Sequence, residues 1–256
     1  MRRSGEYLVS VIMPVYNSSA TLFESINSVL IQTYSNLELI VVDDFSNDGS
    51  RQIISEISKV DERVKALKLE ENGGAAKARN FAIERAQGRF IAFLDADDIW
   101  VNNKLERQVQ FSIQNHAAIS HTSYRWVDKT GVQLRKVISV KPTLSYLNML
   151  NFNHIGCLTA MYDIEVLGRK YFMPDIRKRQ DYGLWLKIMR EGHLAYGLNE
   201  VLAYYRISDN SLSSNKWDSA RYNFTLLRNY EGLSFIKALY HFFRYFMIGI
   251  HKHFFS

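Results

Sequence analysis

The chain of 256 residues has one cysteine, three prolines and no long uninterrupted apolar segment. With a single thiol, Cys157, it cannot form an internal disulfide. The N-terminal residues pass directly into a short apolar strand, without the apolar core and small-residue cleavage site of a secretion signal. We therefore expect the protein to act in the cytoplasm.

Low-complexity linkers and internal repeats are also absent, whereas 47% of the residues are hydrophobic. This composition can bury a sizeable core and is typical of a globular protein. We expect one domain over residues 1–215, followed by helices over residues 216–256. Within the domain, we expect the two parts on either side of residue 120 to have different roles.

The two parts of the chain differ in charge. Residues 1–100 contain 11 basic and 15 acidic residues, whereas residues 101–256 contain 21 and 11, which gives net charges of −4 and +10. This asymmetry predicts two different partners. We do not expect nucleic acid to be one of them, because the basic residues lie among apolar aromatic residues or beside carboxylates.

Strand and helix patterns alternate over the first part of the chain. Short apolar runs predict strands, and segments with apolar residues three and four positions apart predict helices. The strands are expected at 7–15, 37–42, 64–69 and 90–94, and the helices at 21–32, 49–60, 75–86 and 103–113. This order predicts a mostly parallel sheet flanked by helices on both faces, with ligands beyond the carboxyl ends of the strands. No Gly-x-Gly-x-x-Gly motif follows the first strand, which disfavours a nicotinamide-binding fold.

The pattern changes after residue 120. Residues 123–138 predict two short strands joined by a turn, and further strands are expected at 157–162 and 201–207. Between them, residues 180–192 predict a helix that ends at a glycine.

Three carboxylates, Asp95, Asp97 and Asp98, follow the strand at 90–94. Like charges at a buried strand end repel one another unless a cation offsets them. Oxygen ligands favour Mg²⁺ or Mn²⁺, and Mg²⁺ is usually held by one or two carboxylates together with substrate phosphates. The run therefore predicts a divalent metal that binds with a diphosphate.

Three alternatives compete for this acidic run. A calcium loop is disfavoured because Ile99 and Trp100 stand where it needs an oxygen ligand and a glycine. A dehalogenase-type phosphohydrolase also has Asp-x-Asp after an apolar strand, but normally near the N-terminus, whereas three strand-helix units come first here. The third alternative is a solvated acidic cap at the next helix start.

Residues 9–50 and 72–100, with "VSVIMPVYN", "VVDDFSNDGS", "NGGAAKARN" and "FIAFLDADDIW", resemble the nucleotide-binding half of family-two glycosyltransferases. The resemblance implies an α/β, Rossmann-like GT-A fold, with a nucleotide-sugar-binding half at 1–120 and an acceptor-binding half at 121–215. It also implies transfer of a hexose or N-acetylhexosamine from a nucleotide sugar, here a UDP-sugar, with inversion and Mn²⁺ or Mg²⁺. A non-catalytic nucleotide-sugar-binding or lipid-binding module remains an alternative.

The resemblance assigns roles on the donor side. Asp97 and Asp95 are the expected metal ligands, and Asp44 is expected to accept a hydrogen bond from the base edge. The full set of expected donor contacts comprises Pro14, Val15, Tyr16, Asp43, Asp44, Arg79, Asp95 and Arg206.

Asp181 matches the family's catalytic base, although Gln180 replaces the usual preceding glutamate. Residues 204–216 resemble the loop that folds over the donor phosphates, with Ser208 in place of a common histidine. The residues that could contact the acceptor, or could equally be structural, are His154, Arg179, Tyr182 and Trp185.

Residues 232–256 alternate aromatic and cationic residues without an uninterrupted apolar span. On a helix, five basic residues fall within one stripe: Lys237, His241, Arg244, His251 and Lys252. We expect this helix to lie on an anionic membrane at the inner face of the cell membrane, and alternatives are docking on the core or a dimer contact. A lipid-diphosphate-linked glycan is then the expected acceptor, as in bacterial O-antigen or capsule synthesis.

Overall fold

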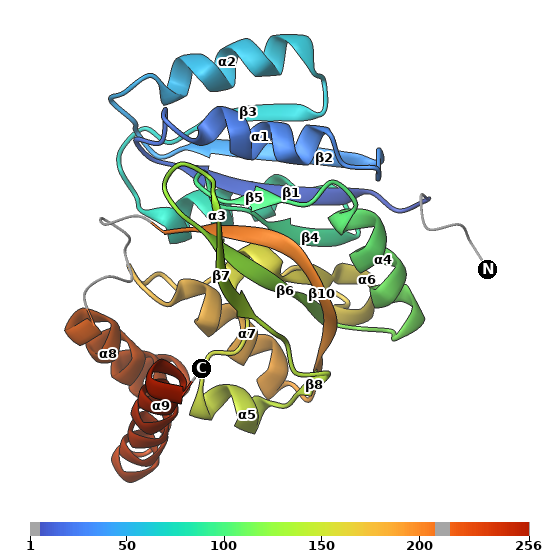
Figure 1. Cartoon of the computed structure of the whole chain (residues 1–256). Coiled ribbons are helices and arrows are strands. Elements are labelled where there is room, and N and C mark those ends of the chain that lie inside the picture. The colour runs from blue at the N-terminus through green and yellow to red at the C-terminus, as the bar shows by residue number, and fades with distance from the viewer. Residues whose placement is uncertain (1–5, 208–215, 256) are drawn as a thin grey trace.

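The computed structural model describes residues 6–207 and 216–255, with side chains described over residues 6–207 and 220–248. Within these ranges the strands form one mixed sheet in the order β3-β2-β1-β4-β9-β6-β10-β5, with β7 beside β6 and β8 beside β10 (Figure 1). The strands are β1 (Val9–Val15), β2 (Leu37–Asp43), β3 (Val64–Lys68), β4 (Phe90–Phe93), β5 (Ile99–Trp100), β6 (Ile119–Val127), β7 (Gln133–Ile138), β8 (Thr143–Leu144), β9 (Met161–Asp163) and β10 (Ala195–Arg206). The helices are α1 (Leu22–Leu30), α2 (Ser50–Val60), α3 (Ala75–Arg85), α4 (Lys104–Gln114), α5 (Tyr146–Asn151), α6 (Ile164–Leu167), α7 (Gln180–Arg190), α8 (Lys216–Thr225) and α9 (Phe235–Phe255), with a 3₁₀ turn η2 (Cys157–Thr159) and a π-helical turn η3 (Leu226–Tyr230).

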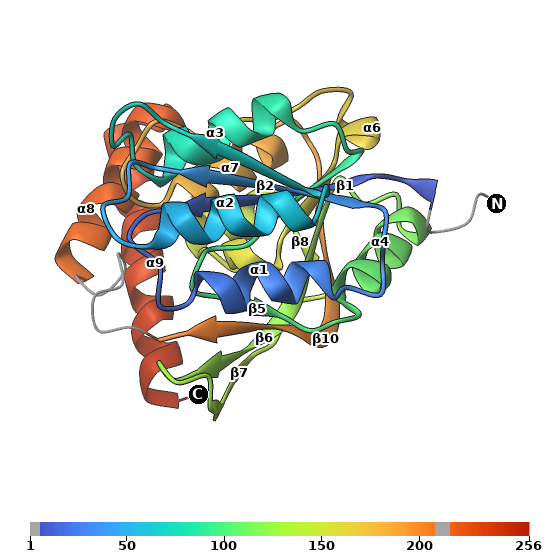
Figure 2. The ribbon, with the colours of Figure 1, turned by 90° about the horizontal axis from the view of Figure 1, so that it is seen from above.

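β1 is buried on both faces because its side chains alternate between two hydrophobic cores. Ile12 belongs to the core covered by α3 and α7, whereas Val11 and Met13 belong to the core covered by α1, α2 and α4. Figure 2 shows α1 and α3 on opposite sides of β1 and β2. β1 pairs in parallel with β2 and β4, and β2 with β3, which confirms the predicted α/β fold. The carboxyl ends of these strands therefore share one edge of the sheet.

The second half continues the same sheet through antiparallel pairs. β9 pairs with both β4 and β6, and β5 pairs with β10. The predicted hairpin at 123–138 is confirmed as β6 and β7. The strand predicted at 157–162 is wrong in its first half, because Thr159 and Ala160 donate turn hydrogen bonds to Gly156 and Cys157 and form η2 instead.

The C-terminal helix α9 packs one side against the body of the protein and leaves the other side exposed. On the packed side, Ala238 is fully buried and the His241 ring lies 2.9 Å from Asn151. His241 therefore does not belong to an exposed cationic stripe, whereas Lys237 and Arg244 are exposed. His251 and Lys252 lie outside the described side chains.

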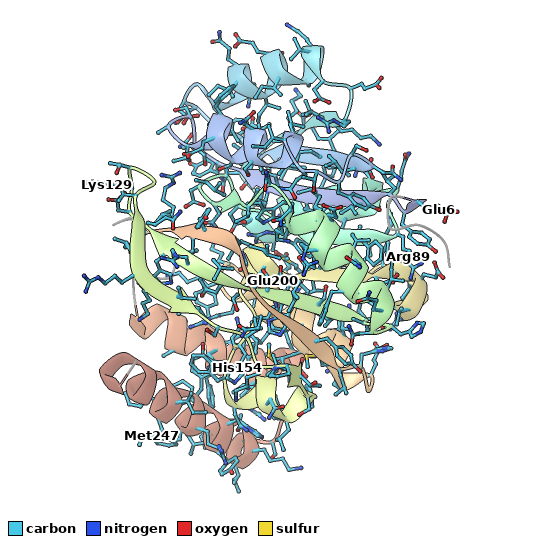
Figure 3. The ribbon with its side chains drawn as sticks, turned by 45° about the vertical axis from the view of Figure 1, so that its right-hand side comes forward. Glu6, Arg89, Lys129, His154, Glu200 and Met247 are labelled. Atoms are coloured by element: carbon cyan, nitrogen blue, oxygen red, sulfur yellow. The ribbon has the colours of Figure 1, made fainter. Side chains whose placement is uncertain are left out.

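The exposed side of α9 is apolar, and Figure 3 shows its Met247 at the margin of the molecule. The exposed large side chains on this helix are Phe235, Ile236, Leu239, Tyr240, Phe243, Phe246 and Met247. Over the described part of the chain, no helix combines the length and the apolar character needed to cross a bilayer.

Candidate active site

A cavity of about 1860 Å³ opens beyond the carboxyl ends of β1 and β4 and extends to the start of α7. It is lined by segments that are far apart in the sequence, from both halves of the sheet and from α9. The cavity collects most of the residues that the sequence singled out: Pro14, Val15, Tyr16, Asp44, Arg79, Asp95, Asp97, His154, Arg179, Asp181 and Arg206.

Three predicted site residues do not line this cavity. The Asp43 carboxylate is buried and accepts hydrogen bonds from the Arg51 side chain and the Ser46 backbone. Trp185 is fully buried and packs on the Phe93 ring, and Tyr182 is fully buried, with its hydroxyl donating to a backbone carbonyl of α5. All three side chains are buried and bond or pack within the protein, so they are not among the contacts that we propose below.

Asp44 connects the end of β2 to the start of α3. Its carboxylate accepts hydrogen bonds from the backbone N–H groups of Gly73 and Gly74, at 2.7 and 2.8 Å. Gly74 has φ +82°, a left-handed conformation that favours glycine. Burial raises the pKa of Asp44, and the two N–H groups oppose that shift. The carboxylate is thus fixed in direction at the cavity wall.

The acidic run after β4 contains three different environments. The Asp95 carboxylate accepts a hydrogen bond from the Arg79 guanidinium at 2.5 Å. Burial and the Asp95 charge raise the pKa of Asp97 to about 6. Asp98 is 1% exposed and accepts from the backbone N–H of Arg206 at 2.9 Å, and burial raises its pKa well above the usual value. Asp98 therefore connects β10 to this run; all three aspartates line the cavity, and Asp95 and Asp97 are more exposed than Asp98.

The Arg206 guanidinium braces the acidic run. It donates to the backbone carbonyl of Asp97 at 2.8 Å, to that of Lys129 at 3.0 Å and to the Glu24 carboxylate at 2.5 Å. These bonds use one N–H of each guanidinium nitrogen, which is three of the five N–H donors of an arginine. Residues 208–215 of the predicted phosphate loop, including Ser208, lie outside the described residues.

Asp181 stands in the first turn of α7 and lines the cavity. Burial raises its pKa, and Arg79, the Tyr182 N–H and Arg179 act in the opposite direction. Arg79 is 5% exposed and interacts electrostatically with both Asp95 and Asp181. Two of its guanidinium nitrogens, Nε and Nη1, have no hydrogen-bond partner among the described residues. One buried cation thus lies close to carboxylates on both sides of the cavity.

No group of three or more His, Cys, Asp or Glu side chains in the described ranges is arranged to hold a metal ion. Asp95 and Asp97 offer two carboxylates, and the charge of Asp95 contributes to the raised pKa of Asp97. This surplus of negative charge fits a divalent cation whose other ligands come from a bound diphosphate. It does not fit a closed protein metal site.

Sequence reasoning missed several residues of this cavity. Tyr245 of α9 and Cys157 contribute to its wall, and Glu24 holds Arg206. The basic side chains of the β6–β7 region, Lys129, Arg135, Lys136 and Lys141, also line the cavity. The net positive charge of residues 101–256 indicated a basic surface, but the sequence does not show where in the fold these four side chains lie.

Residues 10–172 match the family model described as glycosyl transferase family 2. The chain belongs to this family. It is 46% identical to TuaG of Bacillus subtilis (strain 168), over 93% of this chain and 94% of that protein, and the name of TuaG describes a glycosyltransferase of teichuronic acid biosynthesis. It is 39% identical to WfgD of Escherichia coli, over 98% of this chain and 97% of that protein. WfgD is named a UDP-Glc:alpha-D-GlcNAc-diphosphoundecaprenol beta-1,3-glucosyltransferase.

Solved structures confirm the GT-A-like fold of this family-2 glycosyltransferase. S. aureus TarS 1-349 in complex with UDP-GlcNAc gives a TM-score of 0.71 at 22% identity, over 96% of this chain and 73% of that one. Mannosyltransferase PcManGT from Pyrobaculum calidifontis, in complex with GDP-Man and Mn²⁺, gives 0.68 at 19% identity, over 89% and 65%. The predicted family and enzyme class are thus confirmed, and the phosphohydrolase and non-catalytic alternatives are not favoured.

Proposed function

We propose that this glycosyltransferase moves a sugar from a UDP-sugar to a hydroxyl of a lipid-diphosphate-linked saccharide during synthesis of a bacterial surface polysaccharide. The observation that carries the proposal is one cavity with Asp95 and Asp97 at one wall and Asp181 at another. Relatives named for transfer to GlcNAc-diphosphoundecaprenol support the acceptor class.

On the donor side, Asp44 is the proposed contact to the base edge, because its fixed carboxylate can only accept hydrogen bonds when ionised. Pro14, Val15 and Tyr16 would line the nucleoside, at the end of β1. Asp97 and Asp95 would hold Mn²⁺ or Mg²⁺, which when bound offsets the negative charge of the donor diphosphate.

On the acceptor side, Asp181 would take the proton of the accepting hydroxyl. The hydroxyl oxygen then forms a bond to the anomeric carbon while the bond from that carbon to the diphosphate oxygen breaks, and the nucleoside diphosphate leaves with the bonding electrons. One displacement from the opposite side inverts the anomeric centre. Burial raises the pKa of Asp181, which favours proton uptake, and the Arg79 cation opposes that rise.

We also propose that α9 lies on the inner face of the cell membrane. Its exposed apolar side carries Phe243 and Phe246, with the cations Lys237 and Arg244 also exposed. This combination suits an anionic bilayer surface, where an apolar face enters the headgroup region and lysine and arginine attract anionic lipids. A membrane position would bring the cavity to a lipid-linked acceptor.

The transfer assay uses UDP-glucose and other UDP-sugars with a short-chain lipid-diphosphate GlcNAc acceptor, with and without Mn²⁺. Acceptor-dependent release of UDP together with a new disaccharide supports the function. Release of UDP or phosphate at the same rate without acceptor would contradict it.

The membrane position of α9 is tested by flotation with anionic liposomes. The wild-type protein is compared with a variant in which Phe243 and Phe246 are both replaced by serine. Phe23→Ser is the matched control, because Phe23 is 63% exposed on α1, outside the C-terminal helix. We expect the α9 variant to lose most of its flotation and the control to keep it. Equal flotation of all three proteins would refute this position of the helix.

A further inference from the structure

Tyr245 is the point at which α9 reaches the cavity. Its hydroxyl accepts a hydrogen bond from Arg179 Nη1 at 2.7 Å, and its ring stacks on Phe152 with centroids 5.0 Å apart. Arg179 directly precedes α7 and lies two residues before Asp181. The C-terminal helix is therefore connected to the proposed base through a single intervening side chain.

Arg179 is the last of three consecutive cations that line the cavity, after Arg177 and Lys178. Among the described residues that line the cavity, the carboxylates are Asp44, Asp95, Asp97, Asp98 and Asp181. Apart from Asp181 itself, these lie at the ends of β2 and β4. The cavity thus has an acidic donor wall and a basic segment on the acceptor side of Asp181.

The hydrogen bond to Tyr245 uses one of the five N–H donors of the Arg179 guanidinium. The remaining donors can form the paired hydrogen bonds with which arginine recognises phosphate oxygens. The bond that Arg179 donates to Tyr245 limits the rotation of this long side chain, so less conformational entropy is lost when an anion binds.

We propose that Arg177, Lys178 and Arg179 form the subsite for the diphosphate of the acceptor, and that Tyr245 positions Arg179 to receive it. This inference rests on the proposed transfer to a lipid-diphosphate-linked saccharide. When the accepting hydroxyl and the diphosphate belong to the same sugar, an anion site and a base must lie about one sugar ring apart. Arg179 and Asp181 are two residues apart at the start of one helix, line the same cavity and interact electrostatically, which agrees with this requirement.

The same arrangement relates the subsite to the membrane-facing helix. A lipid diphosphate lies at the depth of the headgroups, which is where an interfacial amphipathic helix also lies. Tyr245 is on the inward side of α9, so the helix that meets the bilayer also positions the residue that meets the diphosphate.

The test measures kcat and KM for two soluble acceptors that share one sugar and one short alkyl chain. One acceptor carries the diphosphate, and the other is the neutral alkyl glycoside. For Arg179→Met we expect kcat/KM to fall about 10- to 100-fold with the diphosphate acceptor, the loss typical of a charged hydrogen bond. With the neutral acceptor the fall should be several times smaller, and Arg179→Lys should recover part of the loss.

Tyr245→Phe tests the positioning role, because it removes the hydroxyl and keeps the ring on Phe152. We expect a rise of about 3- to 10-fold in KM for the diphosphate acceptor, the size expected when one long side chain must be immobilised on binding, with the KM for the donor unchanged. The matched control is Tyr240→Phe, on the same helix, because the Tyr240 hydroxyl also accepts from an arginine, Arg244, at 2.9 Å, but on the exposed side. It should change neither acceptor constant.

Equal losses with both acceptors in Arg179→Met and Tyr245→Phe would overturn the subsite, as would no loss with either. If Arg179→Met does not fold, Arg177→Met measures the same subsite at an exposed position. Wild-type protein that transfers to neither acceptor would contradict the proposed function. Wild-type protein that transfers to both with equal kcat/KM would overturn the diphosphate subsite alone.

Discussion

The Arg79 guanidinium donates a hydrogen bond to the Asp95 carboxylate at 2.5 Å and also opposes the rise that burial causes in the pKa of Asp181. One buried cation therefore acts on a residue proposed for the donor side and on the residue proposed as base. Its position on α3 explains how the first half of the chain can influence chemistry at the start of α7.

Replacing Arg79 by methionine should move the acidic limb of the pH profile of kcat/KM to higher pH. Asp181 must be ionised to accept a proton, and Arg79 favours its ionised form, so loss of the cation raises the pKa of Asp181. The control is Lys77→Met, which removes an exposed cation from the same helix. A variant with lower activity but an unmoved limb would show that Arg79 does not tune the base.

Asp181→Asn should lower kcat by about 10²- to 10⁴-fold, the usual size of general-base catalysis. The KM for the donor should stay near its original value, because the proposed role of Asp181 is on the acceptor side of the cavity. Asp175→Asn provides an exposed control in the segment before α7. Near-normal turnover of the Asp181 variant would remove this residue from the mechanism.

Arg206→Met should destabilise the protein by about 2 kcal/mol or more in urea unfolding, because the Asp97 and Lys129 carbonyls lose their buried donor. It should also raise the KM for the donor, since the acidic run loses its brace. Glu24→Gln removes the charge of the exposed partner of Arg206. It should lower the free energy of unfolding by at most about 1 kcal/mol, because Glu24 is largely exposed. An unchanged donor KM in Arg206→Met would contradict the bracing role.

Lys104 should make stability rise with pH above neutrality. Its side chain is fully buried, with Nζ 2.6 Å from Gln108 Oε1 and 4.0 Å from the Trp100 ring centre, and burial lowers its pKa to about 7. The unfolded chain therefore binds one more proton than the folded one between about pH 7 and the ordinary lysine pKa, so the free energy of unfolding rises with pH in that window.

Lys104→Met should reduce this slope by up to about 1.4 kcal/mol per pH unit between pH 7.5 and 9.5, as measured by urea unfolding at several pH values. Lys59→Met, at an exposed position of α2, should leave the slope unchanged. If the free energy of unfolding changes with pH equally in the wild type and in Lys104→Met, Lys104 is not neutral in the folded protein.

The donor wall was largely predictable because it depends on local patterns. The short apolar runs before Pro14, Asp44 and Asp95 predict strands of a sheet covered on both faces, and polar residues after such strands meet at one edge. Tyr182 and Trp185 were harder to assign because large aromatic side chains suit both a sugar site and a core. Their spacing with Leu186 and Met189, at i, i+3, i+4 and i+7, marks a core-facing stripe of α7, and all four are buried.

Long-range contacts account for the rest. No local pattern reveals that Glu24 and the carbonyls of Asp97 and Lys129 surround Arg206. The contact between Arg179 and Tyr245 joins positions 66 residues apart. Such pairs depend on how α9 docks, and docking is decided by the packing of the whole C-terminal segment.

Cys157 lies in the cavity wall and is the chain's only cysteine. Burial raises the pKa of its thiol well above the usual value, so alkylating reagents should react faster at alkaline pH, where more thiolate is present. A maleimide dye would therefore label the protein at one position without any engineered mutation. Because that position lines the cavity, a ligand that fills the cavity should slow the labelling of Cys157.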